Sequence, residues 1–300
     1  MSMSSVSHNS VEVKSASVSD SPTVRAEMVD YNGYLYYVSY GSVYKHGSDG
    51  NFLVIDNGTI RCITAENGCL FYLTNDNELY KTDFNGNAPA LVWSYDECGL
   101  DVMSFGIRSI HAHRDVIYII YDVICVMAYD LKTGNTVDFA EDVSTAAFAG
   151  GYMYYTDHAQ RTFSIFRKNL ETGETELFRG DGETFENSKE IMYDEVMSVG
   201  DEVYYTMRFP VSLYRLSPDG DDELLFTGED NMSTCFVSGS DIFFALSDEG
   251  NGKIYKYSTA EGELSEYKVN GFFPGRGYSV LGDTLCYLDD SGDVLKAELK

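Results

Sequence analysis

Four arginines recur at equivalent positions of a repeated sequence pattern, although the chain of 300 residues has only 21 lysines and arginines. Each stands ten or eleven residues before the centre of a short apolar block that returns along the chain; they are Arg25, Arg61, Arg108 and Arg276. A guanidinium group presents a planar fork of donors that suits a carboxylate or a phosphate. The spacing therefore predicts an arc of arginines that binds an anionic ligand. The alternative is that each arginine pairs with a nearby acidic residue and joins adjacent repeats.

Four further side chains are candidates for the same binding surface because they fall in or beside the expected loops. Arg161 and Arg208 would lie at its rim, and Trp93 and Phe273 would act as aromatic anchors. Arginine and large aromatic residues are the usual anchors of protein interfaces. For Trp93 the alternative is a place in the core between two repeats, because tryptophan is usually largely buried.

The sequence contains no pattern that indicates catalysis or a metal site. His111 and His113 would share one face of a strand, but no third ligand is evident nearby, whereas zinc sites take three or four protein ligands. A structural pair of histidines is the alternative that this spacing favours. We therefore predict no catalytic residue, no metal and no cofactor. If the protein were an enzyme, His111 or a carboxylate would be the candidate base.

The charge of the chain limits the partners it can have. Its 48 acidic residues give a net charge of −27, which repels nucleic acid and anionic membrane surfaces. We expect a protein or peptide partner that is basic overall or that presents a carboxylate to the arginines. Solubility alone is the other explanation of such a charge. The oligomeric state cannot be derived from these features.

The sequence also predicts in which compartment the protein is found. No apolar run reaches the roughly 18 residues of a membrane span, so we expect a soluble protein. The N-terminal residues are rich in serine and lack the basic and apolar regions of a secretory signal, which predicts a cytoplasmic protein, or a secreted one if the natural chain begins earlier. The six cysteines form no CxxC pair and are expected to be reduced, structural thiols.

An apolar block recurs seven times, about 42 residues apart, which is the size of a four-stranded propeller blade. A second strand-like segment and a glycine-containing turn follow most copies, a third strand-like segment comes next, and another precedes each block. The pattern predicts an all-β, seven-bladed β-propeller with four antiparallel strands per blade. The copies are GYLYYV (33–38), GCLFYL (68–73), DVIYII (115–120), GYMYY around Tyr154, DEVYYT (201–206), DIFFAL (241–246) and DTLCYL (283–288).

The two ends of the chain predict how the ring closes. The last unit stops at Lys300 after its third strand, and a strand-like segment at 11–14 stands before the first complete unit. We expect residues of about 10–15 to supply the missing outer strand, which would protect the first and last sheets from exposed edges. This makes residues 10–300 a single domain and leaves 1–9 as a disordered, serine-rich tail.

The YYTD sequence at 154–157, followed by an apolar and basic strand and by LETG, resembles the YWTD repeat of propellers of the low-density lipoprotein receptor kind. It also resembles uncharacterised bacterial propeller proteins of that pattern. The periodicity covers about residues 24–299, but only this repeat comes close to the motif. The resemblance implies a protein-binding surface without enzyme activity. Because the motif is structural, it says more about the fold than about function.

The function expected from these observations is a non-enzymatic binding or scaffold propeller that recognises a protein, peptide or other anionic ligand around the central channel. Loops carried by a rigid scaffold are the usual place of such a site. One alternative is a lyase or hydrolase that acts on an anionic substrate at the mouth of the channel. The other is a glycan-binding lectin whose exposed aromatic residues stack on sugar rings.

Overall fold

The computed structural model describes residues 7–10, 13–15, 28–31, 34–47, 50–95, 107–121, 125–141, 143–157, 164–180, 193–208, 210–219, 221–228, 235–246, 252–272, 278–281, 283–288 and 294–299. They form two compact units. The first unit consists of Met1–Ala16 with Asp142–Lys300, and the second of Ser17–Glu141. In the described residues, no helix has the length and apolar character needed to cross a membrane.

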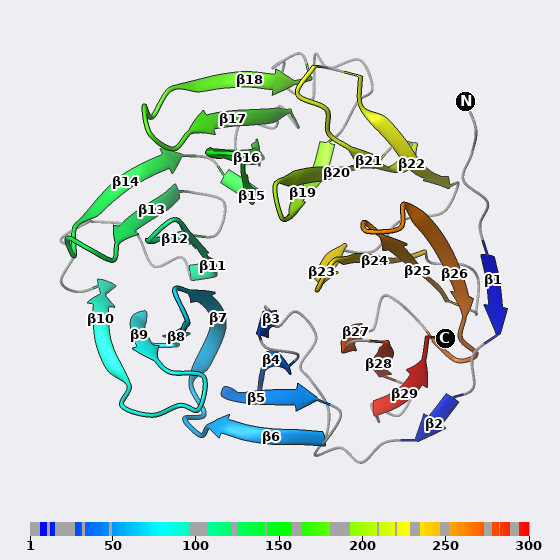
Figure 1. The fold of residues 1–300 in the computed structure, drawn as a ribbon, viewed down its shortest axis with the longest axis horizontal. Coiled ribbons are helices and arrows are strands. Elements are labelled where there is room, and N and C mark those ends of the chain that lie inside the picture. Colours follow the sequence, from blue (N-terminus) through cyan, green and yellow to red (C-terminus); the bar gives the residue numbers. More distant parts are fainter. Residues whose placement is uncertain are drawn as a thin grey trace. The chain divides into compact units, whose positions relative to one another are not determined.

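The second unit holds three antiparallel sheets, each a meander of four consecutive strands (Figure 1). Within each sheet we call the first strand in chain order the inner strand and the fourth the outer strand. The sheets are β3 (Met28–Tyr31), β4 (Tyr34–Ser39), β5 (Ser42–Gly47) and β6 (Gly50–Ile55); β7 (Ile60–Glu66), β8 (Cys69–Thr74), β9 (Glu78–Thr82) and β10 (Ala90–Ser94); and β11 (Ile107–His113), β12 (Val116–Tyr121), β13 (Cys125–Asp130) and β14 (Thr136–Glu141).

The first unit holds four further sheets built on the same meander. Two have four consecutive strands: β15 (Val143–Ala149), β16 (Tyr152–Asp157), β17 (Ile165–Asn169) and β18 (Thr175–Arg179); and β19 (Tyr193–Val199), β20 (Glu202–Arg208), β21 (Val211–Arg215) and β22 (Glu223–Gly228). The other two each include an N-terminal strand: β23 (Phe236–Ser238), β24 (Asp241–Leu246), β25 (Lys253–Ser258) and β26 (Glu263–Lys268) with β1 (Ser7–Ser10); and β27 (Tyr278–Leu281), β28 (Thr284–Leu288) and β29 (Val294–Glu298) with β2 (Val13–Ser15).

The repeated apolar block forms the second strand of each sheet. In β8, β12, β16 and β24 a partly buried first residue is followed by five buried ones. Consecutive residues of a strand point to opposite faces, so burial of nearly every residue explains why the sequence of this strand is mostly apolar. Four-stranded meanders packed face to face are the blades of a propeller, and the chain is an all-β propeller as predicted.

Aromatic residues join the second strand to the third at the same place in five sheets. Each pair consists of two directly opposed residues whose rings stack, with interplanar angles of 5° to 23°. Opposed aromatic residues stabilise a strand pair beyond the burial of their area. This explains the recurrence of YY, FY and FF in the sequence. The pairs are Tyr37–Tyr44, Tyr72–Tyr80, Tyr155–Phe166, Tyr205–Tyr214 and Phe244–Tyr255.

The turn after β17 shows why the ETG sequence ends a strand. The Oδ1 atom of Asn169 accepts hydrogen bonds from the N–H groups of Glu171 at 2.8 Å and Thr172 at 2.9 Å. Gly173 has a φ of 74°, a conformation that glycine adopts without strain, and its N–H donates to the carbonyl of Asn169 at 2.9 Å. The KTG turn at residues 132–134 uses Asp130 in the same way.

The N-terminal segment follows the expectation in one respect and departs from it in another. β2 pairs antiparallel with β29, so Val13–Ser15 supply the outer strand that the last unit lacks. However, Ser7–Ser10 form β1, which adds to β26 in parallel as a fifth strand. The disordered tail expected for residues 1–9 therefore does not extend over Ser7–Asn9, and this sheet departs from the expected four antiparallel strands.

Candidate functional site

The predicted arginine positions coincide with a β-bulge in the inner strands. In β7 the pairing with β8 shifts register between Ile60 and Cys62, so that Arg61 is the extra residue. In β11 the same shift between Ile107 and Ser109 makes Arg108 the extra residue. β15 and β19 have equivalent shifts, at Ser144 and at Asp194 with Glu195. A bulge leaves its extra residue out of the ladder and aims its side chain differently, and bulges are frequent beside binding sites.

Arg61 is held on rigid structure but is itself unengaged. Its neighbours Ile60 and Cys62 are both buried, whereas the Arg61 side chain is exposed. Within the described part of the chain, Arg61 forms no ion pair and no side-chain hydrogen bond. The alternative prediction, that each arginine of this set pairs with a nearby acid, is therefore not met at Arg61.

The inner strands of adjacent sheets in the second unit are joined directly. The N–H of Ala112 in β11 donates to Oγ1 of Thr64 in β7 at 3.1 Å. The N–H of Asp115 donates to Oε1 of Glu66 at 3.3 Å. These two bonds hold β7 against β11 within the second unit. The backbones of Arg61 and Arg108 therefore lie in neighbouring sheets that are held together.

The other predicted site residues are placed only in part. Arg25, Arg161, Arg276 and Phe273 lie outside the described residues. Arg108 lies in β11 and Arg208 ends β20, but their side chains are not among those described. Of the four arginines of the predicted arc, the structure describes the backbones of Arg61 and Arg108 and the side chain of Arg61, so the arc itself stays a prediction.

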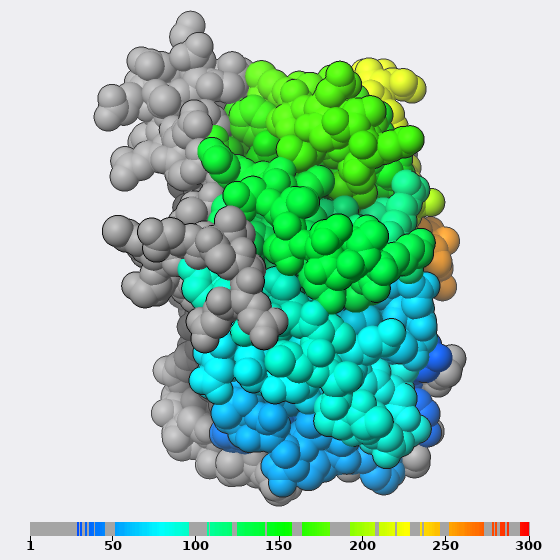
Figure 2. Space-filling model, turned by 90° about the vertical axis from the view of Figure 1, so that its left-hand side faces the viewer, coloured from blue at the N-terminus to red at the C-terminus, as the bar shows by residue number. Residues whose placement is uncertain are grey.

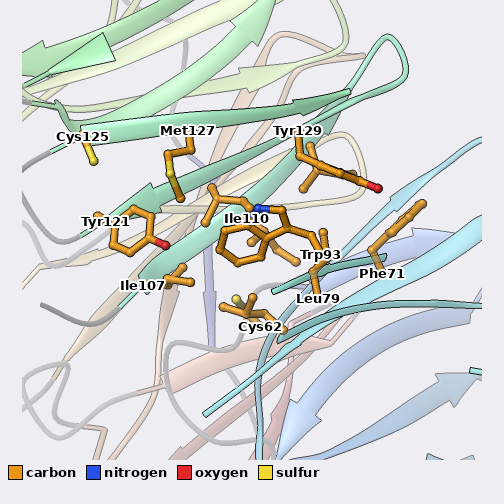
Figure 3. Packing of buried hydrophobic residues seen from close by; sticks show 13 residues of the cluster. Cys62, Phe71, Leu79, Trp93, Ile107, Ile110, Tyr121, Cys125, Met127 and Tyr129 are labelled. Carbon is orange, nitrogen blue, oxygen red and sulfur yellow. The ribbon is translucent and has the colours of Figure 1, made fainter. Parts of the chain in front are cut away.

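Trp93 is a core residue. It is 5% exposed and packs with Leu79, Ile107, Ile110 and other residues of the two sheets β7–β10 and β11–β14, as Figure 3 shows. Its indole Nε1 is buried and has no hydrogen-bond partner among the described residues. The structure therefore agrees with the alternative prediction for Trp93, in which its side chain fills the space between two repeats. Its ring is not available as an anchor on the surface.

His111 and His113 both lie in β11 and are partly buried. Nε2 of His111 lies 3.1 Å from Oγ of Ser109. Burial lowers the pKa of His111 to about 4, so that its imidazole is neutral at pH 7. A general base works best when its pKa lies near the working pH, which argues against His111 in that role. Among the described residues, no group of three or more His, Cys, Asp or Glu side chains could hold a metal ion.

The cysteines behave as expected where they are described. Cys62, Cys69, Cys125 and Cys235 are not in disulfides. Burial, aided by Asp138 and Glu141, raises the pKa of the Cys125 thiol to about 11. A thiol of this kind is inert at neutral pH, because the thiolate is the reactive form.

Three arginines of the first unit show the opposite situation to Arg61, and sequence reasoning did not single them out. Each one is paired with at least one carboxylate within the unit: Arg167 with Glu176, Arg179 with Asp222, and Arg215 with Glu202 and Glu223. The Arg167 guanidinium also lies over the rings of Tyr152 and Phe178, at 4.6 and 4.2 Å from their centroids. Arg167 and Glu176 pair because they are directly opposed in the neighbouring strands β17 and β18.

The Arg179 pair is the most buried of the three. Nε and Nη2 of Arg179 donate to the two carboxylate oxygens of Asp222 at 2.8 and 2.9 Å. Asp222 also accepts from Tyr205 Oη at 2.9 Å and from the N–H of Ser217 at 2.8 Å. Burial acts to raise the pKa of Asp222, but the bonds from Arg179, Ser217 and Tyr205 outweigh it and hold the pKa below its ordinary value. This network joins β18 to the sheet β19–β22.

A cavity of about 370 Å³ lies beside the same two sheets of the first unit. Its wall includes Tyr154 of the YYTD sequence and four acidic residues, together with Arg215. Because Glu202 and Glu223 already pair with Arg215, the cavity offers no unengaged guanidinium to an anion. The four acidic residues are Asp201, Glu202, Asp221 and Glu223.

Comparison with known proteins supports the fold and does not establish a function. No family model matches the chain, and no curated protein matches it. PorZ, a surface component of the type-IX secretion system of Porphyromonas gingivalis, has a similar structure with 11% identity and a TM-score of 0.63. The match covers 92% of this chain but only 37% of PorZ. YCF48 bound to a D1 peptide matches with 9% identity and a TM-score of 0.60, over 100% of this chain and 98% of YCF48.

The chain is a β-propeller by structure. Identities this low show the fold alone, and the ligands of these propellers are properties of those proteins. A nidogen–laminin complex also matches, with 14% identity and a TM-score of 0.45 over 62% of this chain and 72% of the matched chain. That likeness is too distant to carry an argument about the YWTD kind, which stays a prediction from the sequence.

Proposed function

We propose that this protein is a non-enzymatic binding propeller that recognises an anionic group of a protein or peptide at the bulged arginines of its inner strands. The observation that supports this most directly is Arg61, which is exposed and unpaired in the described part of the chain although acidic residues outnumber basic ones by 48 to 21. Among the arginines whose side chains are described, Arg167, Arg179 and Arg215 pair with carboxylates, whereas Arg61 and Arg114 do not, and of these two Arg61 is the one in a bulge of an inner strand. A function in binding accounts for it.

The rigidity of its surroundings also supports a binding role for Arg61. The bulge is anchored by buried residues on both sides, and the hydrogen bond from Ala112 to Thr64 ties its sheet to the next one. A guanidinium whose backbone is already fixed loses less entropy when it binds than one on a mobile loop. Arg108, in the equivalent bulge, would be the second contact, and Arg25 and Arg276 would extend the arc.

We further infer that the seven sheets form one ring of seven blades, closed by β2. The support is the common meander of the sheets and the pairing of β2 with β29, which would complete the last blade from the start of the chain. Closure of this kind would protect the first and last sheets from exposed outer edges. The propeller would be of the YWTD kind, in accordance with the YYTD sequence at 154–157.

The partner we propose is a protein or peptide that presents a carboxylate to the arginines and is basic elsewhere. Long-range repulsion from a net charge of −27 would keep strongly acidic molecules away, while the short-range fork of a guanidinium selects the carboxylate. A basic segment that ends in, or includes, a single acidic group satisfies both conditions.

Isothermal titration tests this proposal. Wild-type protein is titrated with inorganic phosphate and with peptides that are basic overall and carry one carboxylate, near physiological salt, where the Debye length is about 8 Å. We expect a peptide to bind and the double variant Arg61→Ala/Arg108→Ala to weaken binding at least about tenfold, as the loss of charge-assisted bonds implies. The matched control is Arg215→Ala, which removes a paired arginine and should leave binding unchanged. Absence of binding to the wild type, or equal loss in the control, would overturn the proposal.

A further inference from the structure

Five of the outer strands share a bulge at one position. In β6, β10, β14, β18 and β22 the pairing with the third strand skips one residue. The skipped residue is apolar in every case, and four of the five pack against the hydrophobic clusters, while Phe139 lies edge-on to Tyr118. The five residues are Val54, Val92, Phe139, Phe178 and Leu225.

Four of the five strands also expose an apolar residue immediately before the bulge. Each of these residues is opposite the same position of the third strand and is between 44% and 51% exposed; they are Leu53, Leu91, Leu177 and Leu224. In β14 that position is the exposed Asp138, and the exposed apolar residue is Val137, one position earlier. An outer strand with exposed apolar residues would be a template for pairing with another chain. A bulge twists such a strand and breaks its ladder, so the five bulges protect these edges. In Figure 2 the blue and cyan atoms belong to the second unit and include those of β6 and β10, whereas β14 has the green of the following residues.

β26 differs from these outer strands in each respect. It pairs with β25 in continuous register over all six residues, without a bulge. The position that is apolar and exposed in β6, β10, β18 and β22 is Glu266 in β26, which is buried and accepts a hydrogen bond from Tyr255 Oη at 2.7 Å. Leu264 and Tyr267 of the same strand are buried as well. β26 therefore has the regular pairing and the burial of a strand inside a sheet.

The neighbour of β26 is a strand from far away in the sequence. β1 lies parallel to it, with Ser7 opposite Ser265 and Ser10 opposite Lys268 (Figure 1). Four residue pairs hold β1, whereas six hold β25 on the other side. An edge that is regular and accepts a parallel strand is how β-augmentation sites bind extended peptides, mainly through backbone hydrogen bonds.

We propose that the outer edge of β26 is a strand-addition site for an extended segment of a partner protein, and that β1 is its internal occupant. The ligand is a segment with small polar side chains, as in Ser7–Ser10, that is uncharged or basic. A second copy of this chain is a poor source, because it carries the same net charge of −27 and is repelled. The site is separate from the bulged arginines and does not depend on the function proposed for them.

Occupation by β1 also makes the site regulated. A segment attached to the same chain has a high effective concentration, so a partner segment binds only in the fraction of molecules in which β1 has left. Its ladder of four pairs is the weaker side of β26, which favours local release over unfolding of the sheet. Loss of β1 should therefore increase the apparent affinity for an external strand.

Hydrogen exchange measured by mass spectrometry tests the proposal with a synthetic peptide of residues 5–12, SVSHNSVE, as the probe. Deletion of residues 1–10 keeps β2 and should accelerate exchange in 263–268 at least about tenfold, because amides that lose their strand partner become accessible. The peptide, added to this variant, should restore protection there, and a scrambled peptide should not. β22 at 223–228 is the internal control, because its bulged edge should not respond to either change.

A second variant keeps the full chain. His8→Pro/Asn9→Pro removes at least one N–H directed at β26, since successive residues of a strand point their N–H groups in opposite directions. It should expose 263–268 in the same way, whereas Met3→Pro/Ser4→Pro, before β1, should not. Unchanged exchange in 263–268 in both the deletion and His8→Pro/Asn9→Pro, or peptide protection of 223–228 equal to that of 263–268, would overturn the proposal. Arg61→Ala/Arg108→Ala should leave every one of these results unchanged.

Discussion

Arg179 and Arg61 are both arginines of strands in sheets of the same design, yet their surroundings differ completely. Arg179 ends an outer strand, is 16% exposed, and meets a carboxylate with two hydrogen bonds. Arg61 occupies a bulge of an inner strand, is exposed, and meets no carboxylate among the described residues. In a protein this acidic, the paired arginines have a structural role. Arg61, which is unpaired and lies in a bulge of an inner strand, is the candidate for binding a ligand.

The largest expected effect is at the partly buried pair of Arg179 and Asp222. Asp222→Ala leaves the Arg179 guanidinium without its carboxylate, and we expect a loss of about 3 kcal/mol of unfolding free energy, as for a broken buried ion pair. Urea denaturation followed by circular dichroism measures it. The double variant Arg179→Met/Asp222→Leu should lose less than Asp222→Ala, because no charge is left unpaired. If the single variant is as stable as the wild type, the pair has no structural role.

On acidification, the unfolding free energy should fall over two different pH ranges, one set by His111 in the second unit and one by Asp222 in the first. The pKa of His111 in the fold is about 4 against an ordinary 6.5, so the unfolded chain binds more protons and the unfolding free energy falls as the pH drops from about 6.5 to 4. The loss is on the order of 2 kcal/mol after allowing for solvent screening. The pKa of Asp222 is lowered from 3.8, so its contribution is present above that value and is lost as the pH falls through the lowered pKa.

Denaturation at pH 7, 5 and 4 checks the first window, with His111→Gln as the variant. This variant should flatten the fall in unfolding free energy between pH 6.5 and 4 and leave the more acidic loss in place. A wild-type protein equally stable at pH 7 and pH 4.5 would contradict the assignment of a neutral His111.

The exposed pair should contribute much less than the buried one. The Arg215 side chain is 41% exposed, and its partners Glu202 and Glu223 are exposed as well. Arg215→Ala should therefore cost no more than about 1 kcal/mol, the range measured for surface ion pairs. A double-mutant cycle with Glu223→Ala isolates the pair. A coupling energy as large as that of Arg179 with Asp222 would show that exposure does not separate the two cases.

The smallest effect on stability is expected at Arg61. Its side chain makes no ion pair or hydrogen bond with the described chain, so Arg61→Ala should change the unfolding free energy by less than about 0.5 kcal/mol. The same urea titration measures this. A loss above 1 kcal/mol would mean that Arg61 has a structural partner and would weaken its assignment to a ligand site.

Part of this arrangement could be predicted from the sequence because it depends on neighbours along the chain. The equivalence of Arg61 and Arg108 follows from counting back from the repeated block, and the structure places them in equivalent bulges of β7 and β11. The bulges themselves give a weak signal, an adjacent apolar pair such as Leu91–Val92 or Leu224–Leu225 in an otherwise exposed strand. β26 lacks that pair, a difference that becomes visible only after the strands have been aligned.

Other features could not have been predicted, because their cause lies in residues that are distant in sequence. The position of Trp93 alone does not say whether its ring faces solvent or the next sheet. Likewise, β1 is a short polar segment whose strand conformation comes from the edge it joins, since strand propensity depends strongly on context.

Apart from β1, the sequence by itself determined the strands, their turns and their order in each sheet. These depend on apolar runs, stacked aromatic pairs and glycines with positive φ, all of which act within about 40 residues of chain. Only the tertiary structure decided which arginines are paired, where Trp93 lies and what covers β26. Arg179 and Asp222 are 43 positions apart, and β1 and β26 lie near opposite ends of the chain. Coulombic attraction and backbone pairing act over a few ångströms of space, so such partners are set by the packing of the sheets.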